Sequence, residues 1–330
     1  MTQRRTHQAR AVVTGAGSGI GQAFALELAR RGGRVLCADL DLDRATHTAE
    51  LIADAGRGSA LPLFCDVSNA DDMAHLAQRA REYFDAPTNL MINNAGVGIG
   101  GRAVGEIGLD DWSWALGINL HGMVFGSELF MPQLRESGSG GLINVASAAA
   151  FAAAPGMAAY NTGKAAVLAL SETIAAEVSG TGLVVTVLCP TFVKTNVAAD
   201  GRISGGSRDL AERLMRTTGK SPQSIARRTL DAHDHGRLYV VPQLDAKAIW
   251  LAKRLMPRLY THGAGLLSRI VPTTSSAAAD HSSPTGSPPT DLAPTDLAPT
   301  DIAHTDIAHT DMPKPSAAPS AHHHQTEMGV

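Results

Sequence analysis

Short apolar runs alternate with longer amphipathic stretches over the first 245 residues of the chain. An unbroken apolar run of this kind is typical of a strand that is buried on both faces. We therefore predict seven strands, at Ala11–Thr14, Arg34–Ala38, Leu61–Cys65, Leu90–Ile92, Gly141–Val145, Leu183–Leu188 and Leu238–Val241.

The stretches between these strands have the length and apolar spacing of helices. They predict helices at Ile20–Arg31, Asp43–Ala55, Ala70–Asp85, Trp112–Leu134, Tyr160–Ser179 and Pro222–His235. Such alternation is typical of a doubly wound α/β domain with a parallel sheet. Residues 191–221 are polar and glycine-rich, and we expect a long irregular connection that serves as a lid or binding loop.

The C-terminal part of the chain has a different composition. The last 59 residues hold nine of the 17 prolines and no aromatic residue, and Thr-Asp recurs there every five residues. Seven acidic residues and one lysine give this part a charge of −6, so the total of −3 leaves about +3 on residues 1–271. We predict a folded domain at 1–245, a basic amphipathic segment at 246–271 and a disordered tail at 272–330.

Composition also excludes several classes of protein. Cys37, Cys65 and Cys189 are odd in number and lie far apart in apolar runs, so we expect reduced core residues and no metal site. The polar N-terminus and the lack of a membrane-length apolar run favour a soluble cytoplasmic protein. The small body charge, without a basic cluster among aromatic residues, argues against nucleic acid as a partner.

A glycine-rich turn is the first candidate binding site. Residues 14–21 read TGAGSGIG and join the first strand to the first helix, where glycines let the backbone approach a pyrophosphate. Asp39 follows Gly21 by 18 residues at the end of the second strand, where a carboxylate can bind the ribose hydroxyls of a dinucleotide. A plain strand-to-helix turn and a helix N-cap are the structural alternatives.

Polar residues also follow the third and fourth strands. Asp66 and Val67 could reach an adenine ring, although Asp66 could equally cap the next helix. Asn93-Asn94-Ala95-Gly96 suits either the floor of a cofactor cleft or an asparagine-rich turn.

Tyr160 and Lys164 form the candidate catalytic pair. They lie one helical turn apart, so a cation stands near a phenol and is expected to lower its pKa. Ser147 precedes Tyr160 by 13 residues, just beyond the fifth strand, and could hydrogen-bond a substrate oxygen. Together these groups could exchange a proton with an alcohol or a carbonyl.

These motifs, in this order and spacing, resemble those of the short-chain dehydrogenase/reductase family. The resemblance rests on TGAGSGIG at 14–21, NNAG at 93–96, Asn119, Ser147 and YNTGK at 160–164, and it covers roughly residues 8–245. It implies a Rossmann-like catalytic domain and a tetrad of Asn119, Ser147, Tyr160 and Lys164. In that tetrad Tyr160 is the acid/base, Ser147 positions the substrate oxygen, Lys164 binds the nicotinamide ribose, and Asn119 holds a water of the proton relay.

The motifs and the resemblance together predict the cofactor site. We expect contacts from Gly15, Ser18, Gly19, Ile20, Gly21, Asp39, Asp66, Val67, Asn93, Ala95, Gly96, Tyr160, Lys164, Pro190, Thr191, Val193 and Thr195. NAD is expected in preference to NADP, because Asp39 would repel a 2′-phosphate. The resemblance also implies a homodimer or homotetramer built on the helices that hold Asn119 and Tyr160.

The chain departs from the family pattern at two places. Pro190 is followed by Thr191 where relatives usually have glycine, which predicts a differently shaped pocket roof. Gly163 precedes the lysine where a residue such as serine is common, and a glycine inside a helix costs about 1 kcal/mol relative to alanine.

The segment from Asp245 to Ile270 carries five cations and one acid. We expect it to pack its apolar face on the substrate pocket or a neighbouring subunit. Attachment to a membrane surface through Trp250 and Tyr260 is the alternative. The histidines of the tail at 304, 309 and 322–324 are expected to be solvated rather than to form a metal site.

The resulting hypothesis is an oxidoreductase that interconverts a secondary alcohol and a ketone by hydride transfer with NAD. An apolar substrate is expected from the apolar residues near the pocket, which are Phe151, Met157, Phe192, Val193, Leu214 and Met215. A 3-oxoacyl thioester reductase of lipid metabolism and a non-catalytic cofactor-binding scaffold are the alternatives.

Overall fold

A computed structural model describes residues 4–195 and 201–268. Seven parallel strands form one sheet in the order β3-β2-β1-β4-β6-β7-β9. Their bounds are β1 (Arg10–Thr14), β2 (Arg34–Asp39), β3 (Ser59–Phe64), β4 (Leu90–Asn93), β6 (Gly141–Val145), β7 (Val184–Leu188) and β9 (Tyr239–Val240). The predicted doubly wound, Rossmann-like α/β fold is confirmed.

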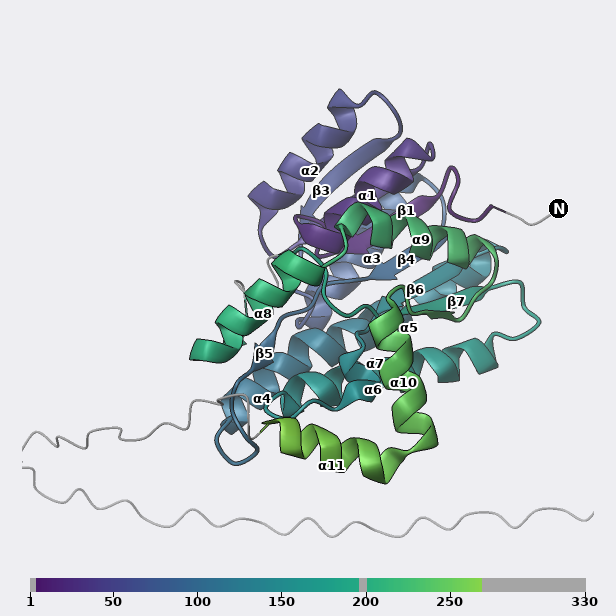
Figure 1. Cartoon of the computed structure of the whole chain (residues 1–330). Coiled ribbons are helices and arrows are strands. Elements are labelled where there is room, and N and C mark those ends of the chain that lie inside the picture. The colour runs from purple at the N-terminus through teal and green to yellow at the C-terminus, as the bar shows by residue number, and fades with distance from the viewer. Residues whose placement is uncertain (1–3, 196–200, 269–330) are drawn as a thin grey trace, which may run out of the picture. The chain divides into compact units, whose positions relative to one another are not determined.

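Helices cover both faces of this sheet (Figure 1). One face carries α1 (Gly19–Arg30), α2 (Leu42–Asp54) and α9 (Pro222–Asp234), and the other carries α3 (Ala70–Phe84), α5 (Gly122–Glu136) and α7 (Ala158–Glu177). Phe24 and Leu28 fill the first layer, and Met73 and Phe130 fill the second. From the adjacent strands β1 and β4, the following strands are added toward opposite edges of the sheet. Folds of this kind bind ligands at the carboxyl ends of the two strands where the order reverses.

Three predicted elements differ from the structure. The β3 strand is only half buried, because it forms the edge of the sheet. The single helix predicted at Trp112–Leu134 consists of α4 (Leu109–Leu116), a π-helical turn η1 (Gly117–His121) and α5. The connection predicted as irregular at 191–221 contains a two-residue strand β8 (Arg202–Ile203), which pairs with β5 (Ile99–Gly100), and the helix α8 (Gly205–Thr218).

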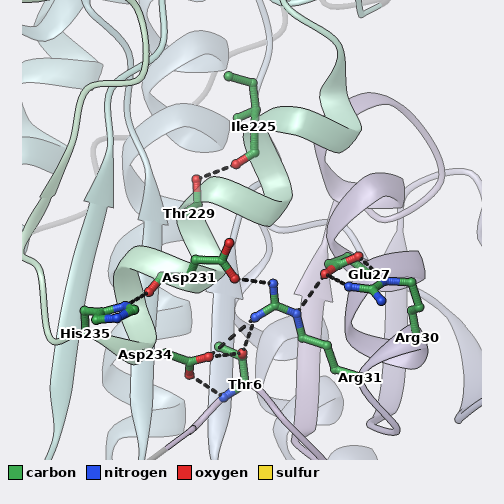
Figure 2. Close-up of polar contacts among 9 residues, drawn as sticks. All are labelled: Thr6, Glu27, Arg30, Arg31, Ile225, Thr229, Asp231, Asp234 and His235. Carbon is green, nitrogen blue, oxygen red and sulfur yellow. Dashed lines mark hydrogen bonds and ion pairs between the residues drawn. The ribbon is translucent and has the colours of Figure 1, made fainter. Parts of the chain in front are cut away.

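An ion cluster around the buried Arg31 fastens the N-terminal segment to both α1 and α9 (Figure 2). The Arg31 guanidinium pairs with Glu27 at 2.9 Å, with Asp231 at 2.6 Å and with Asp234 at 3.4 Å. Asp234 also accepts hydrogen bonds from the backbone and the hydroxyl of Thr6, at 2.9 and 2.7 Å. The cluster fixes α9 beside α1, so the helix that leads into the last strand has a defined position.

The C-terminal segment forms two helices after β9. They are α10 (Leu244–Leu255) and α11 (Pro257–Ser268), and Pro257 divides them. A short helix α6 (Ala149–Ala152) follows Ser147, and α10 packs against it. Among residues 4–195 and 201–268, no helix is long and apolar enough to cross a membrane. The predicted tail at 272–330 lies outside the described residues, so the division of the chain at 245 and 271 stays a prediction.

Candidate active site

The glycine-rich loop between β1 and α1 has a conformation that requires glycine at several positions. Gly15 and Gly19 adopt φ of +63° and +55°, which L-residues rarely do. A Cβ at Gly21 would lie 1.9 Å from the carbonyl oxygen of Gly15, so only glycine fits there. Ser18 stands in extended conformation at the N-terminus of α1, and its hydroxyl makes no capping bond. The loop thus presents backbone and the free first turn of α1 to the carboxyl edge.

Asn94, rather than Asn93, contacts this loop. Nδ2 of Asn94 donates to the carbonyl oxygens of Thr14 and Gly15, at 2.9 and 3.2 Å. The Asn93 side chain points the other way into the core, where Nδ2 donates to Asn144 Oδ1 at 2.9 Å. Successive side chains of a strand point to opposite faces of the sheet, so the two neighbouring asparagines point in opposite directions. Of the two amides expected at the floor of a cofactor cleft, the Asn94 side chain therefore faces the glycine-rich loop and the Asn93 side chain faces the core.

Asp39 fastens the loop to the end of β2. Its Oδ2 accepts a 2.8 Å hydrogen bond from the amide of Gly17, and its Oδ1 accepts one of 3.0 Å from the amide of Asp41. A Cβ at Gly17 would lie 2.6 Å from Cβ of Arg44, so this arginine begins beside the loop. Asp41, not Asp39, caps α2.

Asp66 and Val67 lie after β3, but their contacts are local. Asp66 Oδ1 accepts from the amide and the hydroxyl of Ser68, at 2.9 and 2.7 Å. Asn69 caps α3, so the alternative that Asp66 is the cap is wrong. Val67 is buried against Gly122.

Asn119 lies in the π-helical turn η1, which joins α4 to α5. Its Oδ1 accepts from the Val97 amide at 3.0 Å, and its Nδ2 donates to the Val97 carbonyl at 2.9 Å. The side chain is fully buried. π-turns often occur at functional sites, and here the turn aims an amide toward the segment that follows β4.

Lys164 is buried, and its ammonium is anchored to the sheet. Nζ donates to the carbonyl oxygen of Val145 at 3.1 Å and lies 5.8 Å from the ring centre of Tyr160. Burial lowers the pKa of Lys164 to about 8. One of the three ammonium protons is used by Val145, so the group retains donors for a ligand.

Tyr160 and Ser147 are in contact, and Ser147 is buried just beyond β6. The Ser147 hydroxyl accepts from the Ala149 amide at 3.2 Å and lies 3.5 Å from the Pro190 carbonyl oxygen. Burial raises the pKa of the Tyr160 phenol, and its hydrogen bond with Ser147 acts in the opposite direction. Lys164 is not among the groups that shift the Tyr160 pKa, so the prediction that Lys164 lowers it is not met in this structure.

Gly96 brings these groups together. A Cβ on this residue would lie 2.8 Å from Asn119 Oδ1 and 3.1 Å from Lys164 Nζ. Gly15 in turn lies against Ala95, whose Cα would be 2.9 Å from a Cβ at Gly15. The NNAG segment is therefore the bridge between the glycine-rich loop and the Asn119–Lys164 pair.

The segment after β7 closes the other side of the edge. Thr195 lies against the loop, since a Cβ at Gly19 would be 2.9 Å from Thr195 Cγ2. Gln243 holds this segment in place: its Oε1 accepts from the Thr191 amide at 3.3 Å, and its Nε2 donates to Phe192 at 3.1 Å. Val193 is buried and bridges to Lys220. Sequence reasoning missed Gln243, because a single glutamine carries no motif.

Ion pairs and a cation–π contact connect the β5–β8 pair to α4. Asp111 pairs with Arg102 and, at 2.6 Å, with Arg202, which hold the pKa of its carboxyl below its usual range. The Arg202 guanidinium also lies 4.0 Å from the ring centre of Trp114. Tyr160 packs against the apolar cluster that contains Trp114.

A family model described as short chain dehydrogenase matches residues 9–203. The chain belongs to the short-chain dehydrogenase/reductase family. Members of this oxidoreductase family bind a nicotinamide cofactor. The carboxyl edge fits that group, because the positive φ of Gly15 and Gly19 and the uncapped first turn of α1 present backbone N–H groups to which a pyrophosphate can bind.

Three known proteins illustrate the similarity. Probable oxidoreductase EphD of Mycobacterium tuberculosis is 32% identical over 256 residues, which are 74% of this chain and 43% of EphD. The chain therefore spans less than half the length of that relative. The 2-(R)-hydroxypropyl-CoM dehydrogenase of Xanthobacter autotrophicus is 31% identical over 188 residues, 56% of this chain and 74% of that protein. A Burkholderia phymatum family member solved with NAD is 30% identical with a TM-score of 0.71, covering 76% of this chain and 94% of that one.

Proposed function

We propose that this short-chain dehydrogenase/reductase interconverts a secondary alcohol and a ketone with NAD. The observation that carries the proposal is the placement of Gly96 beside both Asn119 and Lys164, next to the glycine-rich loop. This placement supports the proposal that a dinucleotide bound at the glycine-rich loop would reach Lys164 and its helical neighbour Tyr160. The solved relative with NAD and the relative named for a hydroxypropyl substrate support the same class of reaction.

The proposed cofactor contacts follow the carboxyl edge. The pyrophosphate is assigned to the loop at Gly15, Ser18, Gly19, Ile20 and Gly21, and the adenosine ribose to Asp39. The adenine is assigned to Asp66 and Val67, and the nicotinamide end to Ala95, Gly96, Tyr160, Lys164, Pro190, Thr191, Val193 and Thr195. When bound, the nicotinamide ring accepts or delivers the hydride.

The chain's own residues handle the proton and the oxygen. Ser147 donates a hydrogen bond to the substrate oxygen, while the Tyr160 phenol takes the proton of an alcohol or returns it to a developing alkoxide. Protonated Lys164 donates a hydrogen bond to the ribose. Asn119 positions a water that links Lys164 to solvent.

An apolar substrate is favoured by the side chains around Tyr160. Ile99, Ala115 and Ala159 are buried in the same cluster, with Trp112 and Trp114 partly exposed at its margin. Phe151, expected at the pocket, instead stacks on Trp250 with ring centres 5.8 Å apart. The apolar wall of the pocket is therefore assigned to the β5–α4 side.

The proposal is tested by a panel of secondary alcohols, steroids and acyl thioesters with NAD and NADP, read by nicotinamide fluorescence. We expect NAD-linked oxidation of at least one apolar secondary alcohol. A strict demand for NADPH with acyl thioesters would indicate the lipid reductase instead. Cofactor binding without turnover of any compound would indicate a scaffold.

A further inference from the structure

An unusual share of the exposed apolar surface belongs to α10 and α11. Six of the thirteen exposed large apolar side chains of the described residues lie on these helices or at the junction between them, each between 51% and 82% exposed: Leu244, Leu251, Leu255, Met256, Leu259 and Leu266. Single exposed leucines are ordinary, but a concentrated patch on a water-soluble chain marks an interaction surface.

The helices are fixed to the body by their other faces. Ala246 is fully buried, and Trp250 stacks on Phe151 and lies 5.4 Å from the ring of Tyr239. The Tyr260 hydroxyl donates to the carbonyl oxygen of Ala152 at 2.8 Å. Trp250 and Tyr260 are therefore engaged on the body rather than free to anchor a membrane. The expectation that this segment packs its apolar face on the substrate pocket or a neighbouring subunit stays a prediction. The leucines are the groups left facing outward.

Cations flank these leucines on one side of α10. At about 100° per residue, Leu251 and Leu255 fall within about 20° of Leu244. Lys247 and Arg254 lie about 60° and 80° to one side of that ridge, whereas Asp245 lies about 100° to the other side. An apolar ridge with a basic margin is the pattern of a helix that lies in a membrane interface.

The basic margin continues onto the body of the protein. A hollow of about 790 Å³ lies between α9, β9 and α10, and Arg228, Arg237, Lys247 and Arg254 line it. Its acid, Asp231, is already paired with Arg31 at 2.6 Å. Within residues 4–195 and 201–268, none of the four cations forms an ion pair. These charges are therefore available to an anionic partner.

We propose that the surface formed by Leu244, Lys247, Leu251, Arg254 and Leu255 docks the protein on an anionic lipid bilayer. The leucines enter the acyl boundary, and the cations lie among the head groups. A second copy of the chain fits less well, because a two-fold contact would bring the same basic margin against itself. The proposal is independent of the chemistry proposed above.

Flotation of the full chain with vesicles tests this proposal. We expect binding to phosphatidylcholine vesicles that contain phosphatidylglycerol, and at least about tenfold weaker binding to phosphatidylcholine alone or in high salt. The double variant Leu251→Glu/Leu255→Glu and the double variant Lys247→Glu/Arg254→Glu should each lose at least about tenfold in affinity. Unchanged far-UV circular dichroism and melting temperature establish that both variants are folded.

A matched control keeps the test specific. Arg57 and Arg135 are exposed elsewhere, and Arg57→Glu/Arg135→Glu changes the total charge as much as Lys247→Glu/Arg254→Glu does. This control should bind within about twofold of the wild type. Equal loss in the control, wild-type binding by the leucine variant, or no flotation at low salt each overturns the proposal. The proposal is also overturned if the wild type does not bind vesicles and light scattering shows that the leucine variant only dissociates an oligomer.

Discussion

The amide of Gly17 donates a 2.8 Å hydrogen bond to Oδ2 of Asp39, so one carboxylate both shapes the glycine-rich loop and stands where an adenosine ribose is expected. A 2′-phosphate near this carboxylate would be repelled, since two charges about 4 Å apart interact by about 1 to 4 kcal/mol at the dielectric constants of a protein surface. We predict that NAD exceeds NADP in kcat/KM by at least about tenfold.

Two variants test the origin of that preference. Asp39→Asn keeps an acceptor for the Gly17 amide but removes the negative charge. We expect this variant to lower the ratio of kcat/KM for NAD to that for NADP. Asp39→Ala with Leu40→Arg should narrow or reverse it, because Leu40 is 63% exposed and an arginine fits there. Equal efficiency of the wild type with both cofactors would contradict the argument and implicate Arg44. Arg34 is excluded from that role, since it stacks on Tyr83 at the opposite end of β2.

Replacing Tyr160 by phenylalanine should abolish turnover while cofactor binding stays nearly intact. The ring keeps its volume but has no proton to exchange, and positioned proton transfer contributes about 10²–10⁴-fold. Steady-state kinetics and a fluorescence titration with NADH measure the two properties separately. A variant that keeps more than about a tenth of the wild-type rate would show that another group is the acid/base.

Gly96→Ala should damage the site more than the fold. The new Cβ would lie 2.8 Å from Asn119 Oδ1 and 3.1 Å from Lys164 Nζ, so both groups must shift. Overpacking of this kind costs about 1–3 kcal/mol, and a displacement near 1 Å can cost about 100-fold in rate. Gly117→Ala is the matched control, because its Cβ meets only Ser68 at 3.5 Å. Similar kcat values for the two variants would refute the bridging role of Gly96.

Gly163→Ala, by contrast, should stabilise the protein without loss of activity. A Cβ there makes ordinary contacts, 3.4 Å from Asn119 Cβ and 3.5 Å from Leu116 Cδ2. Alanine in a helix interior then gains about 0.4–1 kcal/mol over glycine. Thermal unfolding should show a melting temperature higher by about 1–4 °C. A lower melting temperature would mean that Asn119 cannot accommodate the methyl group.

The sequence predicted the parallel sheet well, because strands made of unbroken apolar runs can bury both faces only when helices cover the sheet on both sides. It could not reveal β5 and β8, because each is two residues long and neither lies in an unbroken apolar run. The edge position of β3 depends on strand order, which no local pattern encodes. Within the site, motifs located the glycine-rich loop and the Tyr160–Lys164 pair, whereas Gln243 and the π-turn around Asn119 depend on contacts between distant segments.

The last prediction concerns the pH dependence of stability. We expect His233 to make the largest contribution to the loss of stability as the pH falls below about 6.5. This side chain is fully buried, and its Nδ1 lies 2.9 Å from the Thr186 hydroxyl. That hydroxyl donates to the Arg237 carbonyl at 2.8 Å, so Nδ1 carries the proton and Nε2 faces Gly141 without a hydrogen-bond partner in the described part of the chain. Burial, with a smaller effect of Arg5, lowers the pKa of His233 to about 3.

The sign of the effect follows from proton uptake. Below about pH 6.5 the unfolded chain protonates this histidine, whereas the folded chain does not until the pH approaches 3. The unfolded state therefore binds more protons in this window, and the free energy of unfolding falls by up to about 1.4 kcal/mol per pH unit as the pH decreases. Urea unfolding at pH 7.5, 6 and 5 should show a steeper loss in the wild type than in His233→Asn, which keeps an N–H for Thr186 but does not titrate. The two proteins differ in this one side chain, so parallel pH profiles would show that His233 is not held neutral.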